Sequence, residues 1–64
     1  MTEQEWYDNL GRILHDERKR RGMTQADVGV IVDVTGAAVS RWERGIDRMK
    51  AYALHLLRAE GLLP

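Results

Sequence analysis

Five residues with small or hydrogen-bonding side chains recur at the spacing of a single helical stripe. They are Gly36, Ala37, Ser40, Arg41 and Arg44. Small residues at the beginning of the stripe allow a backbone to approach another surface closely. Arg41 behind them is long enough to reach a base edge in DNA, and Arg44 would lie nearer to the flanking phosphates. The stripe therefore predicts a helix that lies in the major groove of double-stranded DNA.

Each of these candidate contacts has an ordinary alternative. Arg41 can donate two parallel hydrogen bonds to guanine O6 and N7; a single arginine is more often simply solvated, and only the helix-pair context favours the contact. Ser40 can bond to a base or a phosphate, but most exposed serines bind nothing. The Ala37 methyl group fits a thymine methyl group and equally well serves helix propensity. Gln25, in the first turn of the preceding helix, is either a phosphate clamp or a solvated residue beside a cap.

Four helices are expected to position this stripe, and no strand pattern of useful length is present. Capping and turn residues mark the ends of these helices. The first helix begins at Thr2 with Glu5 and ends at Gly22, and the second begins at Thr24 with Asp27 and ends at the bend Asp33-Val34. Thr35 and Gly45 bound the third helix, and Asp47 would cap a fourth, which ends near Gly61 and carries the apolar residues Met49, Tyr52, Ala53, Leu56 and Leu57. The prediction is one compact all-α, four-helix domain over residues 1–64, with a helix-turn-helix core at 24–45.

The two helices of this core have apolar positions that can face each other. Val28 and Val32 on the second helix are expected to pack against Val39 and Trp42 on the third. Gly29 is significant because a side chain at this position would hold two crossing helices apart.

Two further features concern packing rather than chemistry. Arg18 and Glu43 fall where the first and third helices should converge, so a partly buried ion pair with a structural role is predicted. Val30 and Ile31 are apolar on a side of the second helix that should face solvent. They either extend the core, form a contact patch, or reflect poor surface optimisation.

Composition excludes several classes of function. The chain has 64 residues, no cysteine and a formal net charge of 0, and its only histidines, His15 and His55, have no metal-ligand spacing. Ser40 is the only serine, and there is no glycine-rich phosphate loop, so neither catalysis nor a metal or cofactor site is expected. No segment has the roughly 20 apolar residues of a membrane span, and no signal peptide is evident, so a cytoplasmic location is expected by default.

Charge is distributed unevenly although the total is zero. Residues 41–50 carry three arginines and a lysine against Glu43 and Asp47, whereas the N-terminus is acidic. The uneven distribution suits one face turned to phosphate.

The stretch from Leu10 to Gly45 resembles the Cro/phage-repressor (Xre-type) helix-turn-helix family, also known as lambda-repressor-like. The matching motifs are Thr24-Gln25, the small residue Gly29, the turn Val34-Thr35 and the ending Trp42-Glu43-Arg44-Gly45. The resemblance implies a homodimer that binds operator DNA and represses transcription, without a small-molecule effector. Carried over by position, it implies a phosphate clamp at Gln25, base readers at Gly36, Ala37, Ser40 and Arg41, a phosphate contact at Arg44, and an ion pair between Arg18 and Glu43. With the capping residue Thr35, the candidate DNA-binding set is Gln25, Thr35, Gly36, Ala37, Ser40, Arg41 and Arg44.

This chain departs from the family pattern at the start of the third helix. Gly36 and Ala37 stand where relatives often carry polar base readers, which leaves Arg41, with Ser40, as the main reader. Asp33 occupies a turn position where glycine is usual, and aspartate tolerates the left-handed region better than most residues.

More than one dimer surface and more than one function are compatible with the sequence. The fourth helix, with Leu57, Leu62 and Leu63, is the expected dimer surface, and Trp6-Tyr7 is the alternative. On the same domain the chain could be the antitoxin of a toxin–antitoxin pair or a restriction–modification controller. It could also be a protein-interaction module with vestigial DNA binding, which exposed Val30-Ile31 would favour.

Overall fold

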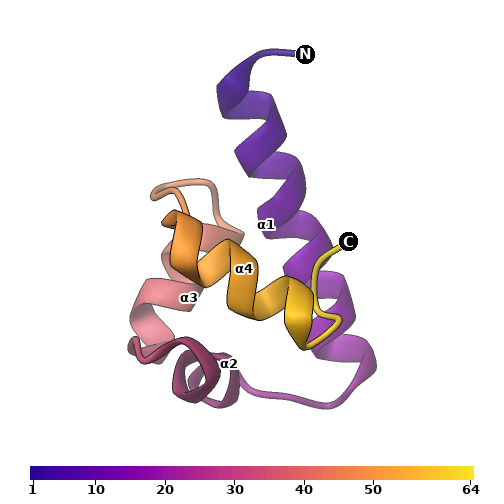
Figure 1. Ribbon diagram of the computed structural model, residues 1–64, viewed down its shortest axis with the longest axis vertical. Helices are drawn as coiled ribbons and strands as arrows, with labels where there is room; N and C mark the ends of the chain where they lie inside the picture. Colours follow the sequence, from indigo (N-terminus) through magenta and orange to yellow (C-terminus); the bar gives the residue numbers. More distant parts are fainter.

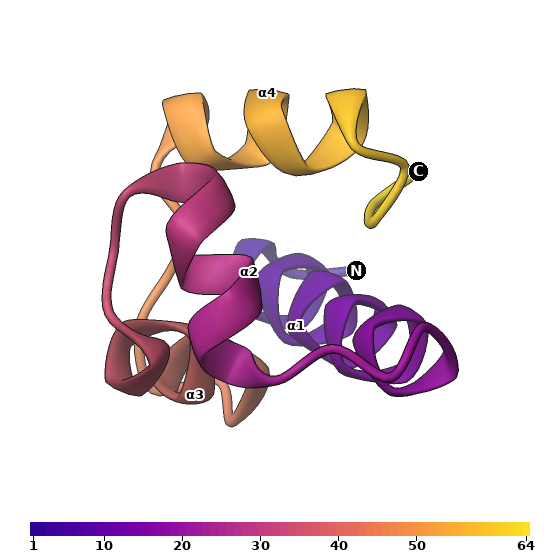
Figure 2. The same cartoon turned by 90° about the horizontal axis from the view of Figure 1, so that it is seen from below.

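The computed structural model describes residues 1–64 and contains four helices and no strand, which confirms the all-α prediction. The helices are α1 (Glu3–Arg20), α2 (Gln25–Val32), α3 (Gly36–Glu43) and α4 (Ala51–Ala59). The first turns of α1 extend past the other helices (Figure 1). Seen from below, α2 lies between α3 and α4, so α3 is at one edge of the molecule (Figure 2). No helix is both long and apolar enough to cross a membrane.

Each of the first three helices begins at a threonine, as the sequence predicts. The Oγ1 atoms of Thr2, Thr24 and Thr35 accept the backbone N–H of the third residue that follows, at 3.2, 3.0 and 3.1 Å. At Thr24 the bond is reciprocated, because Asp27 Oδ2 accepts the Thr24 N–H at 2.8 Å. These bonds satisfy donors that helices leave unpaired at their first turns. The boundaries of the helix pair are therefore determined by local sequence.

The prediction that Asp47 caps the fourth helix is wrong. α4 begins at Ala51, and its N-cap residue Lys50 makes no side-chain capping bond. The reason is the turn at Gly45, whose φ of 75° sends the chain back over the last turn of α3. Asp47 therefore stays beside α3, and Met49, which was expected on the helix, precedes it and is buried.

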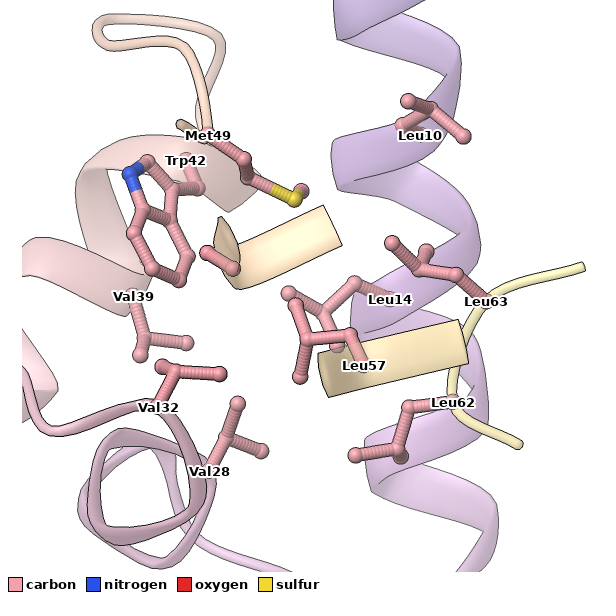
Figure 3. Close-up of a cluster of buried hydrophobic side chains, with 11 residues drawn as sticks. Leu10, Leu14, Val28, Val32, Val39, Trp42, Met49, Leu57, Leu62 and Leu63 are labelled. Atoms are coloured by element: carbon pink, nitrogen blue, oxygen red, sulfur yellow. The ribbon is translucent and has the colours of Figure 1, made fainter. Parts of the chain in front are cut away.

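One hydrophobic core joins all four helices and the C-terminal segment (Figure 3). Its members are Leu10, Leu14, Val28, Val32, Val39, Trp42, Met49, Ala53, Leu57, Leu62 and Leu63. The predicted packing of the two valines of α2 with Val39 and Trp42 in this core is confirmed. Ile31 is partly buried against the core, whereas Val30 is 81% exposed.

The expectation that Leu57, Leu62 and Leu63 form a dimer surface is wrong, because the core of the single chain buries them to 0, 1 and 4% exposure. The segment after α4 turns back toward α1 (Figure 1). Arg21 holds it there by donating to the carbonyl oxygens of Glu60 and Gly61 at 3.0 and 2.9 Å. The large apolar residues that α4 leaves exposed are Tyr52 and Leu56.

Two buried glycines permit the close approaches of this fold. A Cβ atom added at Gly29 would overlap the carbonyl oxygen of Val34, so the close approach is to the turn after α2 rather than to a crossing helix. Gly11 was not singled out from the sequence. A Cβ atom at Gly11 would overlap the Trp42 carbonyl oxygen, which places this glycine where α1 meets α3.

Candidate nucleic-acid interface

A tight bend joins α2 to α3 and determines the direction of α3. Asp33 ends α2 in the left-handed region, with φ 58° and ψ 47°. This conformation agrees with the prediction from the sequence, in which Asp33 stands at a turn position where glycine is usual. The Val34 N–H then bonds to the Gly29 carbonyl oxygen at 2.9 Å, and Thr35 is extended before it caps α3. The bend thus packs the inner side of α3 against α2 and leaves the other side at the surface (Figure 2).

The predicted stripe on α3 is only partly open to solvent. Ala37, Arg41 and Arg44 are exposed, whereas Gly36 and Ser40 are partly buried at its edge. A Cβ atom at Gly36 would lie 3.0 Å from the Ala26 backbone nitrogen. Gly36 therefore allows the first turns of α2 and α3 to approach each other, which is a packing role that the sequence analysis did not assign to it.

Beneath the stripe, Glu43 is the centre of a buried polar cluster. Arg18 donates from Nε to Glu43 Oε2 at 2.7 Å and from Nη2 to Oε1 at 2.9 Å, and the two side chains are only 6 and 4% exposed. The predicted ion pair between α1 and α3 is thus confirmed. His15 Nδ1 lies 3.0 Å from Glu43 Oε1, and the Arg18 Nη1 atom donates to the Met23 carbonyl oxygen at 2.9 Å.

The protonation of Glu43 reflects two opposing effects. Burial by itself raises the pKa of this carboxyl group. Hydrogen bonds from Arg18, His15 and Gln25 outweigh that effect, so the pKa lies below its ordinary value of 4.5. The carboxylate is therefore charged at neutral pH and holds three helices together at the base of α3.

Gln25 and Thr35, both predicted to contact DNA, make structural bonds in this chain. Gln25 Nε2 donates to Glu43 Oε1 at 3.2 Å, which uses one of its two amide hydrogens. Thr35 Oγ1 accepts the Ala38 N–H at the start of α3. The second Gln25 hydrogen and the Thr35 hydroxyl hydrogen remain available, so both residues retain a donor for an anion.

A polar cavity of about 500 Å³ opens between α1, α2 and α3. It is lined entirely by non-hydrophobic residues: Asp8, Arg12, His15, Gln25, Ser40, Glu43, Arg44 and Gly45. The cavity brings Gln25, Ser40 and Arg44 of the predicted set together. Sequence reasoning missed the α1 residues, although Asp8, Arg12 and His15 recur at the i, i+4, i+7 spacing of one helix face.

Arginines around α3 differ in their partners. Arg41 donates to Asp47, which lowers the pKa of that carboxyl group, chiefly by hydrogen bonding. Arg48 donates to Glu3 Oε1 at 2.8 Å and lies over the Tyr7 ring, so it belongs to the acidic start of α1. The Arg44 side chain has no carboxylate partner, and its one hydrogen bond is from Nε to the Ser40 carbonyl oxygen, at 3.4 Å. Exposed ion pairs such as these contribute little to the stability of a fold in water.

Comparison with known proteins agrees with this geometry. A protein-family profile described as a helix-turn-helix domain matches residues 9–61, which include α2, α3, α4 and most of α1. Neither the comparison with curated proteins nor that with solved structures found a match. Because the family profile spans most of the chain, this protein belongs to the family of helix-turn-helix DNA-binding domains.

Proposed function

We propose that this chain is a sequence-specific transcriptional regulator, a repressor of the Cro type that binds a palindromic operator as a homodimer. The observation that supports it best is the orientation of α3. Val39 and Trp42 anchor this helix in the core, while Ala37, Arg41 and Arg44 face outward from the edge of the molecule. An exposed helix with this anchoring can enter a major groove without disturbing the fold.

Within this proposal each outward residue has a distinct role. Arg41 donates two hydrogen bonds to a guanine, and Ala37 and Ser40 adapt to the neighbouring base pairs. Arg44, beside the polar cavity, contacts a backbone phosphate together with the free donors of Gln25 and Thr35. Gly36 contributes close packing at the start of α3. Direct readout thus depends mainly on one arginine.

The proposed homodimer would use the exposed side of α4. Tyr52 and Leu56 are 49 and 38% exposed and lie four residues apart, on one face of the helix. A twofold dimer of this kind would place two copies of α3 in major grooves about one helical turn, roughly 34 Å, apart. Sedimentation of Leu56→Glu beside the wild type tests this surface, with Trp6→Glu as the variant for the alternative surface at Trp6-Tyr7. Dissociation by Trp6→Glu alone would assign the interface to α1.

Two substitutions in α3 test the proposed division of roles. Arg41→Ala should weaken binding to the preferred duplex by about 1–3 kcal/mol and relax the preference at one base pair. Arg44→Ala should weaken binding to all duplexes alike and reduce the steepness of the salt dependence by about one phosphate contact. Identical effects of the two substitutions would refute the assignment of reader and clamp.

A protein-interaction module with vestigial DNA binding is the second candidate. It is favoured by Val30, which is 81% exposed on α2, and by the pairing of Arg41 and Arg48 with acidic residues. Val30→Glu distinguishes the two functions, since it should leave DNA binding unchanged if the regulator proposal is correct and abolish partner binding if the second candidate is.

A further inference from the structure

We propose that Asp47 is a positioning residue that orients Arg41 for base recognition. This inference rests on the proposed function, in which Arg41 reads a guanine. Asp47 Oδ2 accepts a hydrogen bond from Arg41 Nε at 2.5 Å, and Oδ1 accepts one from Nη2 at 3.4 Å. Asp47 was expected to cap α4, so its position beside the reader is a feature that only the structure reveals.

The ion pair with Asp47 leaves free the edge of the Arg41 guanidinium group that would bind a guanine. A guanidinium group carries five N–H donors in one plane. Asp47 takes the Nε hydrogen and one Nη2 hydrogen, which lie along one edge of that plane. The Nη1 group and the second Nη2 hydrogen lie along the adjacent edge, and Arg41 makes no other side-chain hydrogen bond in the structure. That adjacent edge can donate two parallel bonds to guanine O6 and N7.

The backbone determines where Asp47 lies. The left-handed conformation of Gly45 closes the end of α3, where the Gly45 N–H bonds to the Trp42 carbonyl oxygen at 3.2 Å. The N–H groups of Ile46 and Asp47 both bond to the carbonyl oxygen of Arg41 itself, at 2.9 and 3.4 Å. The carboxylate is thus attached through a short, hydrogen-bonded segment to the residue that it orients. A side chain held in this way loses less rotamer freedom when it binds.

The charge of Asp47 acts in the opposite direction on non-specific binding. A carboxylate at the surface beside α3 repels phosphates whatever the base sequence. The benefit of an oriented Arg41 is realised only where a guanine is present. Asp47 should therefore increase discrimination between sequences more than it increases affinity.

The test uses the duplex that the full wild-type chain selects from a random pool and the base pair at which Arg41→Ala loses discrimination. At that pair the wild type should prefer guanine by about 5- to 150-fold. Asp47→Ala, or Asp47→Asn if the alanine variant folds poorly, should reduce this preference several-fold while binding to the three substituted duplexes stays equal or becomes tighter. In the Arg41→Ala background, Asp47→Ala should change nothing further at that pair. Asp16→Asn, which removes an exposed carboxylate on α1, should preserve the preference.

Three results would overturn the inference. Equal weakening on all four duplexes would make Asp47 a residue that only stabilises the loop. Tighter binding on all four with the guanine preference intact would make it a competitor of DNA for Arg41. If the wild type selected no duplex at all, the proposed function would fail as well, whereas selection by the wild type with an unchanged preference in Asp47→Ala would refute only this inference.

Discussion

Replacing Arg18 by methionine should nearly unfold the domain. The substitution keeps an unbranched side chain of similar length but removes the three donors that Arg18 directs to Glu43 and Met23, at 2.7, 2.9 and 2.9 Å. Glu43 is then left with a side chain only 4% exposed and with His15 and Gln25 as its remaining partners.

The size of this effect follows from the burial of the pair. Removing one partner of a buried ion pair costs about 3–5 kcal/mol, because the other charge stays buried without compensation. A domain of 64 residues has a total stability of roughly 3–10 kcal/mol. Arg18→Met should therefore remove a large part of the free energy of unfolding, whereas an ordinary surface substitution changes it by less than about 0.5 kcal/mol.

Urea unfolding, followed by far-ultraviolet circular dichroism and by the combined fluorescence of Trp6 and Trp42, measures this loss. The matched control is the double variant Arg18→Met/Glu43→Met, in which no charge remains buried and at least half of the lost stability should return. A loss below about 1 kcal/mol in Arg18→Met, or a double variant as unstable as the sum of both single variants, would refute the reasoning.

Three further predictions concern the bend, the packing and pH. Asp33→Gly should stabilise the domain by about 0.5–1 kcal/mol in thermal unfolding, since it relieves a φ of 58° and removes a negative charge at the end of α2; Asp33→Asn, which removes only the charge, should give a smaller gain. Gly29→Ala should lower the melting temperature by several degrees, because the added Cβ atom would overlap the Val34 carbonyl oxygen. Gly22→Ala is the control: its Cβ atom meets no other group, so only the positive φ of Gly22 should lower the stability. The contribution of Glu43 to the free energy of unfolding should be constant above its ordinary pKa of 4.5 and fall as pH drops toward its lower pKa in the folded chain. Glu43→Gln should remove this part of the pH dependence in urea titrations at a series of pH values.

The sequence could predict features that depend on neighbouring residues. The three threonine caps, the left-handed Asp33 and the apolar faces of α2 and α3 all follow from spacings of a few residues. The Arg18–Glu43 pair could be predicted although its members are 25 residues apart, because the convergence of α1 and α3 follows from the helix-turn-helix pattern.

Features that depend on where the chain folds back after α3 and after α4 could not be predicted. Asp47 is a residue type that often caps helices, but it does not cap α4, because the turn at Gly45 keeps Asp47 near Arg41. Leu62 and Leu63 look like surface residues until Arg21 fixes the C-terminal segment against α1. Gly11 did carry a signal, since a glycine inside an 18-residue helix is unfavourable without a packing reason.

Selection of bound duplexes from a random DNA pool by the full wild-type chain tests the central claim most directly. The account predicts enrichment of an inverted repeat whose half-sites are about one helical turn apart, each with a guanine whose enrichment disappears in Arg41→Ala. Log affinity for the selected duplex should fall linearly with log salt concentration, by about 0.9 for each phosphate neutralised. A pool that remains random after repeated selection at low salt would contradict the account.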